Sequence, residues 1–122
     1  GCKLLYPDGV SVQHLGGFLR QPLAHAADWR NEPTESWSKT AVYDTDYVIG
    51  AAFLVRRELI EQIGQFDSDY FLYYEDTDLC WRARRAGFRV VVAQEITAVH
   101  HESATTPKNL QLFLCKRCVL PI

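Results

Sequence analysis

Short apolar runs separated by turn residues make up the first part of the chain. Lys3–Tyr6 and Val10–Leu15 flank the tripeptide Pro7-Asp8-Gly9, which is typical of tight turns, so this pattern predicts a β-hairpin. Residues 21–40 hold two prolines, two tryptophans and scattered charges without a helical or strand period. A stretch of that kind predicts a long surface loop, and such loops in compact domains are commonly functional.

A strand and two helices are predicted in the middle of the chain. Asp46–Ile49 is strand-like, and Arg57–Ile63 is predicted as a short helix that ends at Gly64. Residues 75–86 carry acids in the first turn and arginines near the end, with Gly87 directly after them. Because this arrangement complements the helix dipole and supplies a C-cap, 75–86 is the strongest helix prediction in the sequence.

Two β-branched runs and a final helix are predicted toward the C-terminus. Arg89–Ala93 and Ile96–Val99 are each predicted as a short strand. The final helix is expected to have Thr106 as its N-cap and Pro107 at its first position. Its apolar stripe would consist of Leu110, Phe113 and Leu114. The chain therefore mixes short strands with helices.

Composition places the chain among ordinary globular proteins and removes several functional classes. It has 122 residues, 48% of them hydrophobic and 23% charged, which suits one domain. Thirteen basic against fifteen acidic residues leave a net charge of −2, so we expect no nucleic-acid partner. The longest run without polar side chains, Val48–Val55, is far below the roughly 20 residues that span a bilayer. Residues 1–20 lack the pattern of a secretory signal, so a cytoplasmic setting is expected.

Three Asp-x-Asp pairs are candidate sites for a hard divalent cation, which prefers carboxylate ligands. Alternation along a strand would place Asp44 and Asp46 on one face, although solvated acids at a sheet edge give the same pattern. Asp67 and Asp69 lie in turn-like sequence, where an Asx-turn or a helix cap is the preferred interpretation. The third pair, Asp76 and Asp78, begins the predicted helix 75–86.

The third pair has two interpretations, and the residues alone leave them open for Asp76. Helical spacing places Asp76 on the side that carries apolar residues, facing inward or along a cleft, so it is either a reactive carboxylate or an acid that only stabilises the helix dipole. Asp78 and Arg82 are spaced for an ion pair, preferred here as a plain surface pair. The apolar residues on the Asp76 side are Leu79, Cys80 and Ala83.

Histidines and cysteines near the C-terminus are weaker candidates. His100 and His101 follow a predicted strand, where an imidazole could bind a metal or carry a proton, or could simply form a hydrogen bond. Cys115 and Cys118 form a CxxC motif, but the second pair of a zinc site and the preceding strand of a redox motif are both missing. Two cysteines one helical turn apart are the preferred interpretation.

An ordered series of motifs between residues 46 and 103 resembles the C-terminal half of family 2 glycosyltransferases. The closest subset is the bacterial rhamnosyltransferase-like enzymes. The series covers about half of the chain, and its order makes it far more specific than a single Glu-Asp pair. The motifs are Asp46-Tyr47-Val48-Ile49-Gly50-Ala51, Arg56-Arg57, Ile63-Gly64-Gln65-Phe66-Asp67, Phe71-Leu72-Tyr73-Tyr74-Glu75-Asp76-Thr77-Asp78-Leu79-Cys80-Trp81-Arg82 and Val99-His100-His101.

The resemblance implies an α/β fold of the GT-A type, a Rossmann-like nucleotide-diphospho-sugar transferase domain present only in part. It implies that Asp76 is the general base that deprotonates the acceptor hydroxyl and that Glu75 shapes the same pocket. Gly50 and Ala51 would lie near the donor sugar and acceptor, and His100 would approach the metal and diphosphate. Position 65 is Gln where the family usually has Gly. Nearby aromatic rings could stack on sugar faces, with Tyr74 and Trp81 as the candidates, although at least half of the set is expected to belong to the core. The set is Tyr70, Phe71, Tyr73, Tyr74 and Trp81.

The same resemblance implies an inverting, metal-dependent enzyme that uses a nucleotide-diphosphate sugar and a glycan or lipid-linked acceptor. Mg²⁺ or Mn²⁺ would be held mainly by a nucleotide-binding half, with its own Asp-x-Asp, upstream of Gly1. Asp44-Thr45-Asp46 matches the acceptor-side strand instead. Residues 1–122 are thus expected to be a single partial domain, the acceptor-side half, inactive alone. The full-length enzyme would be cytoplasmic, with peripheral association at the inner face of the membrane left open.

Two alternatives to catalysis follow from the same residues. The first is a non-catalytic module of the same fold that binds a glycan or another subunit. The second is a small metal or thiol protein organised around the cysteines at 115 and 118 and the histidines at 100 and 101. A nucleotide-binding half upstream would favour the enzyme, whereas stoichiometric zinc would favour the metal protein.

Overall fold

A computed structural model describes residues 1–20, 25–28, 42–70 and 73–101. Within these ranges lie six strands and two helices: β1 (Cys2–Leu5), β2 (Val12–His14), β3 (Gly17–Arg20), β4 (His25–Asp28), β5 (Val42–Asp44), α1 (Arg57–Ile63), α2 (Glu75–Arg85) and β6 (Val91–Val99). The predicted helix that begins at Thr106, and the Cys115 and Cys118 pair, lie outside the described residues. In the described ranges, no helix has the length and apolar character needed to cross a membrane.

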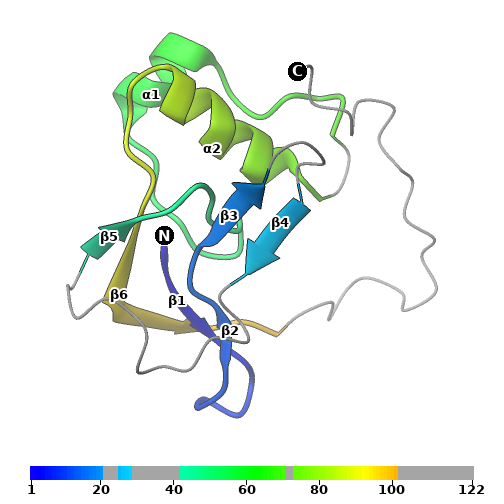
Figure 1. Ribbon diagram of the computed structural model, residues 1–122, viewed down its shortest axis with the longest axis vertical. Coiled ribbons are helices and arrows are strands. Elements are labelled where there is room, and N and C mark those ends of the chain that lie inside the picture. Colours follow the sequence, from blue (N-terminus) through cyan, green and yellow to red (C-terminus); the bar gives the residue numbers. More distant parts are fainter. Residues whose placement is uncertain (21–24, 29–41, 71–72, 102–122) are drawn as a thin grey trace.

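The strands form two sheets, and the helices pack to one side of the larger one (Figure 1). The larger sheet has the order β2-β1-β6-β5, and the smaller one is the antiparallel hairpin β3-β4. β1 and β6 pair in parallel, while β2 and β5 are antiparallel to their neighbours. A parallel pair needs a crossover connection, and the chain between β1 and β6 includes both helices. The predicted mixture of short strands and helices is confirmed.

The predicted hairpin at the start of the chain is confirmed as β1-β2. Asp8 accepts hydrogen bonds at Oδ1 from the amides of Val10 and Ser11, at 2.9 and 2.8 Å. Gly9 adopts φ +70°, a left-handed conformation that glycine reaches without strain. The hydrogen bonds from Ser11 and Val10 lower the pKa of the Asp8 carboxyl. The turn chemistry of Pro7-Asp8-Gly9 was therefore sufficient to locate this element.

Three strand predictions need correction. Residues 25–28 form β4 inside the stretch predicted as a loop, because they pair with β3 through the backbone, and pairing of this kind leaves little trace in local sequence. The predicted strand Asp46–Ile49 lies at Val42–Asp44 instead, and Tyr47 makes only an isolated bridge to Gly17. The two strands predicted after residue 88 are one, β6, because β1 and β5 provide partners on both sides.

Both helix predictions in the described part are confirmed. α1 has the predicted bounds, and Gly64 at φ +81° ends it while donating its amide to Ile60 O at 2.9 Å. α2 ends one residue before the predicted end, with three acids in its first turn and three arginines in its last. These charges match the helix dipole at both ends.

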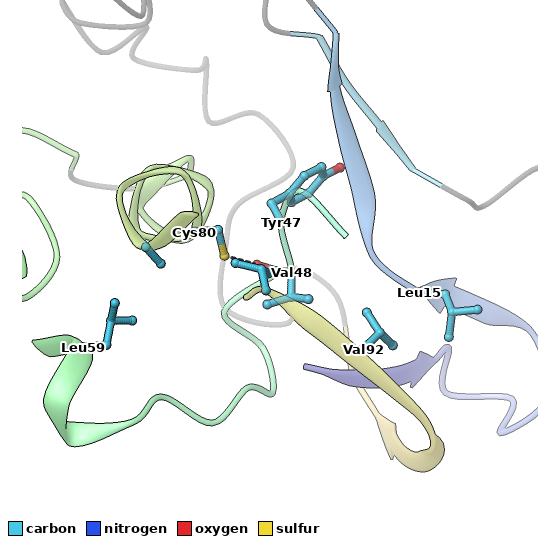
Figure 2. Close-up of a cluster of buried hydrophobic side chains, with 8 residues drawn as sticks. Leu15, Tyr47, Val48, Leu59, Cys80 and Val92 are labelled. Atoms are coloured by element: carbon cyan, nitrogen blue, oxygen red, sulfur yellow. Dashed lines mark hydrogen bonds between the residues drawn. The ribbon is translucent and has the colours of Figure 1, made fainter. Parts of the chain in front are cut away.

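The buried core lies between α2, α1 and the larger sheet (Figure 2). Val92 from β6 is completely buried, and Cys80 from α2 places Sγ 3.9 Å from Val48 O. Burial raises the pKa of the Cys80 thiol, so it stays protonated and acts as an apolar core group. The other members of the core are Leu15, Tyr47, Leu59, Ala83 and Val90.

A buried polar junction joins the two sheets. Thr45 Oγ1 accepts a hydrogen bond from the Gly17 amide at 2.8 Å and lies 2.8 Å from Gly17 O, to which its hydroxyl donates. The Asp46 amide donates to the same carbonyl at 2.9 Å, and Asp46 Oδ2 accepts from Leu19 N at 2.8 Å. Because buried backbone groups are costly to leave unpaired, this junction fixes the segment that follows β5.

Tyr43 gives the fold a measurable dependence on alkaline pH. Its hydroxyl donates to Leu15 O at 2.6 Å, and burial raises its pKa to about 12. In the unfolded chain a tyrosine ionises near pH ~10. The stabilisation is therefore complete below pH ~10 and is lost as the pH rises toward 12. We predict that Tyr43→Phe makes the unfolding free energy fall less steeply between pH 9.5 and 11, measured by urea denaturation. Parallel curves for the two proteins would contradict this.

Candidate functional site

The candidate site lies at the start of α2, where the backbone is strained. Tyr73 and Tyr74 both have φ +68°, a left-handed conformation that is uncommon for non-glycine residues. Tyr74 is the N-cap residue of α2 but forms no side-chain hydrogen bond to the helix. The two side chains are 43% and 49% exposed. Strained backbone of this kind is held in place by other contacts and is often found at functional sites.

Asp76 is held by backbone and side-chain donors. The Gly50 amide donates to Oδ2 at 2.8 Å, while the amide and hydroxyl of Thr77 donate to Oδ1 at 2.6 and 3.2 Å. A carboxylate has about four acceptor positions, so these three donors leave room for a further one. Asp76 is half-buried, which leaves it within reach of a ligand.

Glu75 adds a second carboxylate beside Asp76 at the first position of the helix. Its Oε2 atom is shielded from solvent and, among the described residues, has no hydrogen-bond partner. A buried acceptor left in that state costs about 1–3 kcal/mol. Of the predicted site residues, Glu75, Asp76 and Tyr74 are thus neighbours in sequence and lie at one helix end.

Gly50, one of the two predicted small residues, contacts this helix through its backbone amide. A Cβ placed on Gly50 would lie 3.7 Å from Asp76 Cβ and 3.4 Å from Phe53 Cε1, which the fold could accommodate. Gly50 and Ala51 are both exposed, so both remain accessible to a ligand. The contribution of Gly50 to the site is its backbone amide, which sequence reasoning alone did not identify.

Trp81 lies on α2 but on a different face from Asp76. Five residues separate them, which is about 140° around an α-helix. Arg85 Cζ lies 4.7 Å from the Trp81 ring centroid, so a guanidinium covers one face of the ring. This pair has i, i+4 spacing and could have been predicted from the sequence. The role of Trp81 in stacking on a sugar stays a prediction.

Asp78 and Arg82 form the predicted ion pair, with Nε and Oδ2 2.7 Å apart. The interpretation as a plain surface pair is wrong, because the two side chains are only 10% and 23% exposed. Arg82 also donates through Nη1 to Ile63 O at 3.0 Å and through Nη2 to Gln65 O at 2.9 Å. The arginine therefore links α2 to the end of α1.

The other two Asp-x-Asp pairs have structural partners. Asp44 pairs with Arg89 at 2.8 Å, and Asp46 pairs with Arg84 at 2.5 Å. The Asp69 amide donates to Asp67 Oδ1 at 2.9 Å, which confirms the predicted Asx-turn. Within residues 1–20, 25–28, 42–70 and 73–101, no three His, Cys, Asp or Glu side chains cluster as a metal site would require. The described residues therefore do not make a complete metal site by themselves.

His100 directly follows β6 and contacts residues of β1 and β2. Its Nδ1 atom is 2.8 Å from Oε1 of the buried Gln13, and its amide donates to Leu5 O at 3.0 Å. Because a carbonyl oxygen only accepts, Nδ1 carries the proton in this pairing. In the neutral ring the lone pair is then on Nε2, the atom that could bind a cation. His101 is more exposed.

These observations define a partial α/β domain that places two carboxylates and a backbone amide at one helix end. The family model described as glycosyltransferase like family 2 matches residues 24–117. The chain therefore belongs to this family, and its fold is a partial domain of the GT-A type, as predicted. No solved structure matches the chain significantly.

Three relatives are similar to parts of the chain. The O-antigen biosynthesis protein RfbC of Myxococcus xanthus is 32% identical over 86% of this chain and 8% of its own length. The N-acetylglucosaminyl-diphospho-decaprenol L-rhamnosyltransferase of Mycobacterium tuberculosis is 36% identical over 52% of this chain and 20% of its length. The rhamnosyltransferase WbbL of Escherichia coli K12 is 39% identical over 57% of this chain and 25% of its own length. The chain thus spans a quarter or less of these relatives.

The pairing of His100 with Gln13 predicts a structural role that can be separated from any role of Nε2. We expect His100→Ala to lower the unfolding free energy by about 1 kcal/mol, because the buried Gln13 carbonyl loses a donor. His100→Asn should lose less, since its side-chain amide can replace Nδ1–H, and His101→Ala should be neutral. Denaturant unfolding of the three variants measures this. Equal stability of the Ala and Asn variants would show that the hydrogen bond contributes nothing.

Proposed function

We propose that this chain forms the acceptor side of an enzyme that transfers a sugar from a nucleotide-diphosphate donor to a hydroxyl of a glycan or lipid-linked acceptor, with inversion. Family membership supports sugar transfer in general. The observation that carries the finer proposal is the half-buried Asp76 carboxylate, held at Oδ2 by the Gly50 amide and preceded by the carboxylate of Glu75.

In this proposal Asp76 is the general base. The carboxylate takes the proton of the acceptor hydroxyl, the acceptor oxygen forms a bond to the anomeric carbon, and the bond from that carbon to the nucleotide diphosphate breaks. The electron pair of the broken bond leaves with the diphosphate. One displacement with the acceptor opposite the leaving group inverts the anomeric centre and needs only one correctly placed base.

The surroundings of Asp76 suit that task. The Gly50 amide fixes one carboxylate oxygen without neutralising it, because a backbone N–H donates a hydrogen bond but carries no transferable proton at neutral pH. Glu75, beside Asp76 in the first turn of α2, would shape the same pocket. Tyr74, half exposed two residues before Asp76, would provide a ring for the sugar face.

Binding of the nucleotide-sugar donor and of the cation is proposed for the complete protein that carries this sequence. A divalent cation, Mg²⁺ or Mn²⁺, would supply charge stabilisation for the departing diphosphate when bound. Among the described residues, His100 is the ligand proposed for it, and no three His, Cys, Asp or Glu side chains cluster as a metal site. Its remaining ligands would therefore come from other parts of the complete protein. Peripheral attachment to a membrane, and Ala51 and Trp81 as contacts of the substrate, stay predictions.

Replacement of Asp76 tests the proposal. In the complete protein that carries this sequence, Asp76→Asn should keep donor affinity within about twofold but lower kcat by roughly 10²-fold or more, because an amide oxygen still accepts from the Gly50 amide but takes no proton. Asp78→Asn is the matched control and should lose less. Steady-state kinetics and donor calorimetry measure both.

Two results would contradict the assignment of Asp76 as the base. One is a loss of less than about tenfold in Asp76→Asn, given the usual contribution of a general base. The other is a larger loss in Asp78→Asn than in Asp76→Asn. A complete protein that binds a glycan with no turnover in any variant would favour the alternative of a non-catalytic binding module.

A further inference from the structure

Arg82 uses all three guanidinium nitrogens within the protein. Nε donates to Asp78 on the same helix, whereas Nη1 and Nη2 donate to the carbonyls of Ile63 and Gln65, at 2.7, 3.0 and 2.9 Å. The side chain is only 23% exposed. A planar guanidinium can satisfy several acceptors in one fixed geometry, which a lysine ammonium cannot reproduce. The position is therefore specific for arginine rather than for a positive charge.

The two carbonyls reach Arg82 because of the conformation of Gly64 between them. Gly64 has φ +81° and ψ −177°, a region that is essentially restricted to glycine. A Cβ at this position would meet nothing within 4 Å, so the restriction comes from the backbone alone. Any other residue would have to leave this conformation and turn one or both carbonyls away from Arg82.

The segment between Gly50 and Gln65 therefore holds α2 at two points. The first is the hydrogen bond from the Gly50 amide to Asp76, and the second is the set of bonds from Arg82 to the end of α1. Six residues separate Asp76 from Arg82, which is about 9 Å along a helix. Two attachments at that distance fix both the position of α2 along its axis and its rotation.

α2 is buried in the core through Leu79, Cys80 and Ala83, but its first turn has no side-chain cap. Its N-cap residue, Tyr74, makes no side-chain cap and has a strained backbone. α1, which lies beside α2, contributes only Leu59 as a buried residue. The hydrogen bonds of Arg82 add directional contacts between the two helices to this apolar packing.

We propose that Arg82, with Asp78 and the backbone at Gly64, is a positioning residue that keeps the Asp76 carboxylate on the Gly50 amide. Its consequence for turnover rests on the proposed function of Asp76, whereas its structural part does not. Loss of the Arg82 bonds would let α2 shift, and a displacement of about 1 Å at a reacting group can cost up to 10²-fold in rate.

Two matched pairs of variants test this in the complete protein. Arg82→Lys keeps the charge, and its control is Arg84→Lys, which weakens a different ion pair, with Asp46, from the same last turn of α2. Gly64→Ala changes only the backbone conformation, and its control is Gly9→Ala, which also has positive φ and open space for a Cβ but lies in the β1-β2 turn. If Arg82→Lys fails to fold, Gly64→Ala and its control Gly9→Ala still test the proposal.

The first readout is residue-resolved amide hydrogen exchange at Gly50, which needs no activity. We expect exchange at Gly50 to become at least tenfold faster in Arg82→Lys and Gly64→Ala, while the Thr45 amide, bonded to Val90 O at 3.0 Å, keeps its rate. Both control variants should keep the Gly50 rate within about twofold. Unchanged Gly50 exchange, or equal acceleration in test and control variants, would overturn the proposal.

The second readout is the division between kcat and KM. Both test variants should lower kcat about tenfold or more with donor KM within twofold, and the controls should keep kcat. If Asp76→Asn abolishes turnover while Arg82→Lys and Gly64→Ala retain full kcat, the positioning role is overturned and the base assignment stands. If Gly50 exchange accelerates as expected but Asp76→Asn remains fully active, the structural role is supported and the proposed function of Asp76 fails.

Discussion

The extended segment from Asp44 to Gly50 is the constraint on which the rest of the structure depends. Its residues are fixed in turn by partners from different elements. Thr45 binds the backbone of Gly17 between the sheets, Tyr47 and Val48 enter the core, and the Gly50 amide reaches Asp76. Because the segment is held along its length, the position of the final amide is set by the core rather than by local loop preference. The carboxylate at the start of α2 is located relative to the two sheets in this way.

The helix that carries this carboxylate is held by charge and hydrogen bonding more than by a conventional N-cap. Acids at its start and arginines at its end match the dipole, and the arginines reach other elements: Arg84 pairs with Asp46 of the segment described above, and Arg82 binds the carbonyls that follow α1. Arg84 is 46% exposed, so its pair contributes little to stability, whereas the Arg82 bonds are largely protected from solvent. The site is thus built at the junction of a rigid segment and a helix with several attachments.

Local signals in the sequence located the elements that depend on local interactions. The Asp8-Gly9 turn, the Gly64 end of α1 and the charge pattern of α2 each act within a few residues, and these elements were predicted correctly. β4 was missed because its strand forms only through pairing with β3. The true place of β5 was missed for the same reason, since its partner β6 lies almost 50 residues later in the chain.

In the candidate site, too, the sequence indicated some residues in advance, whereas contacts between distant residues could not be predicted. The carboxylates at 75 and 76 were found from a resemblance and from helical spacing, and the Asp78–Arg82 pair from spacing alone. The hydrogen bond from the Gly50 amide to Asp76 could not be predicted, because 26 residues separate the two. A backbone donor is also not marked by any particular residue type. The pairing of His100 with Gln13, 87 residues apart, was equally invisible.

The central claim is that the Asp76 carboxylate, held by the Gly50 amide, is the group that meets the acceptor hydroxyl. The most direct test is a crystal structure of the complete protein with an acceptor or a non-reactive acceptor analogue bound. The account predicts an Asp76 oxygen within about 3.2 Å of the acceptor oxygen, with Oδ2 still bound to the Gly50 amide. An acceptor hydroxyl bound to a different carboxylate, with Asp76 turned away from the ligand, would contradict it.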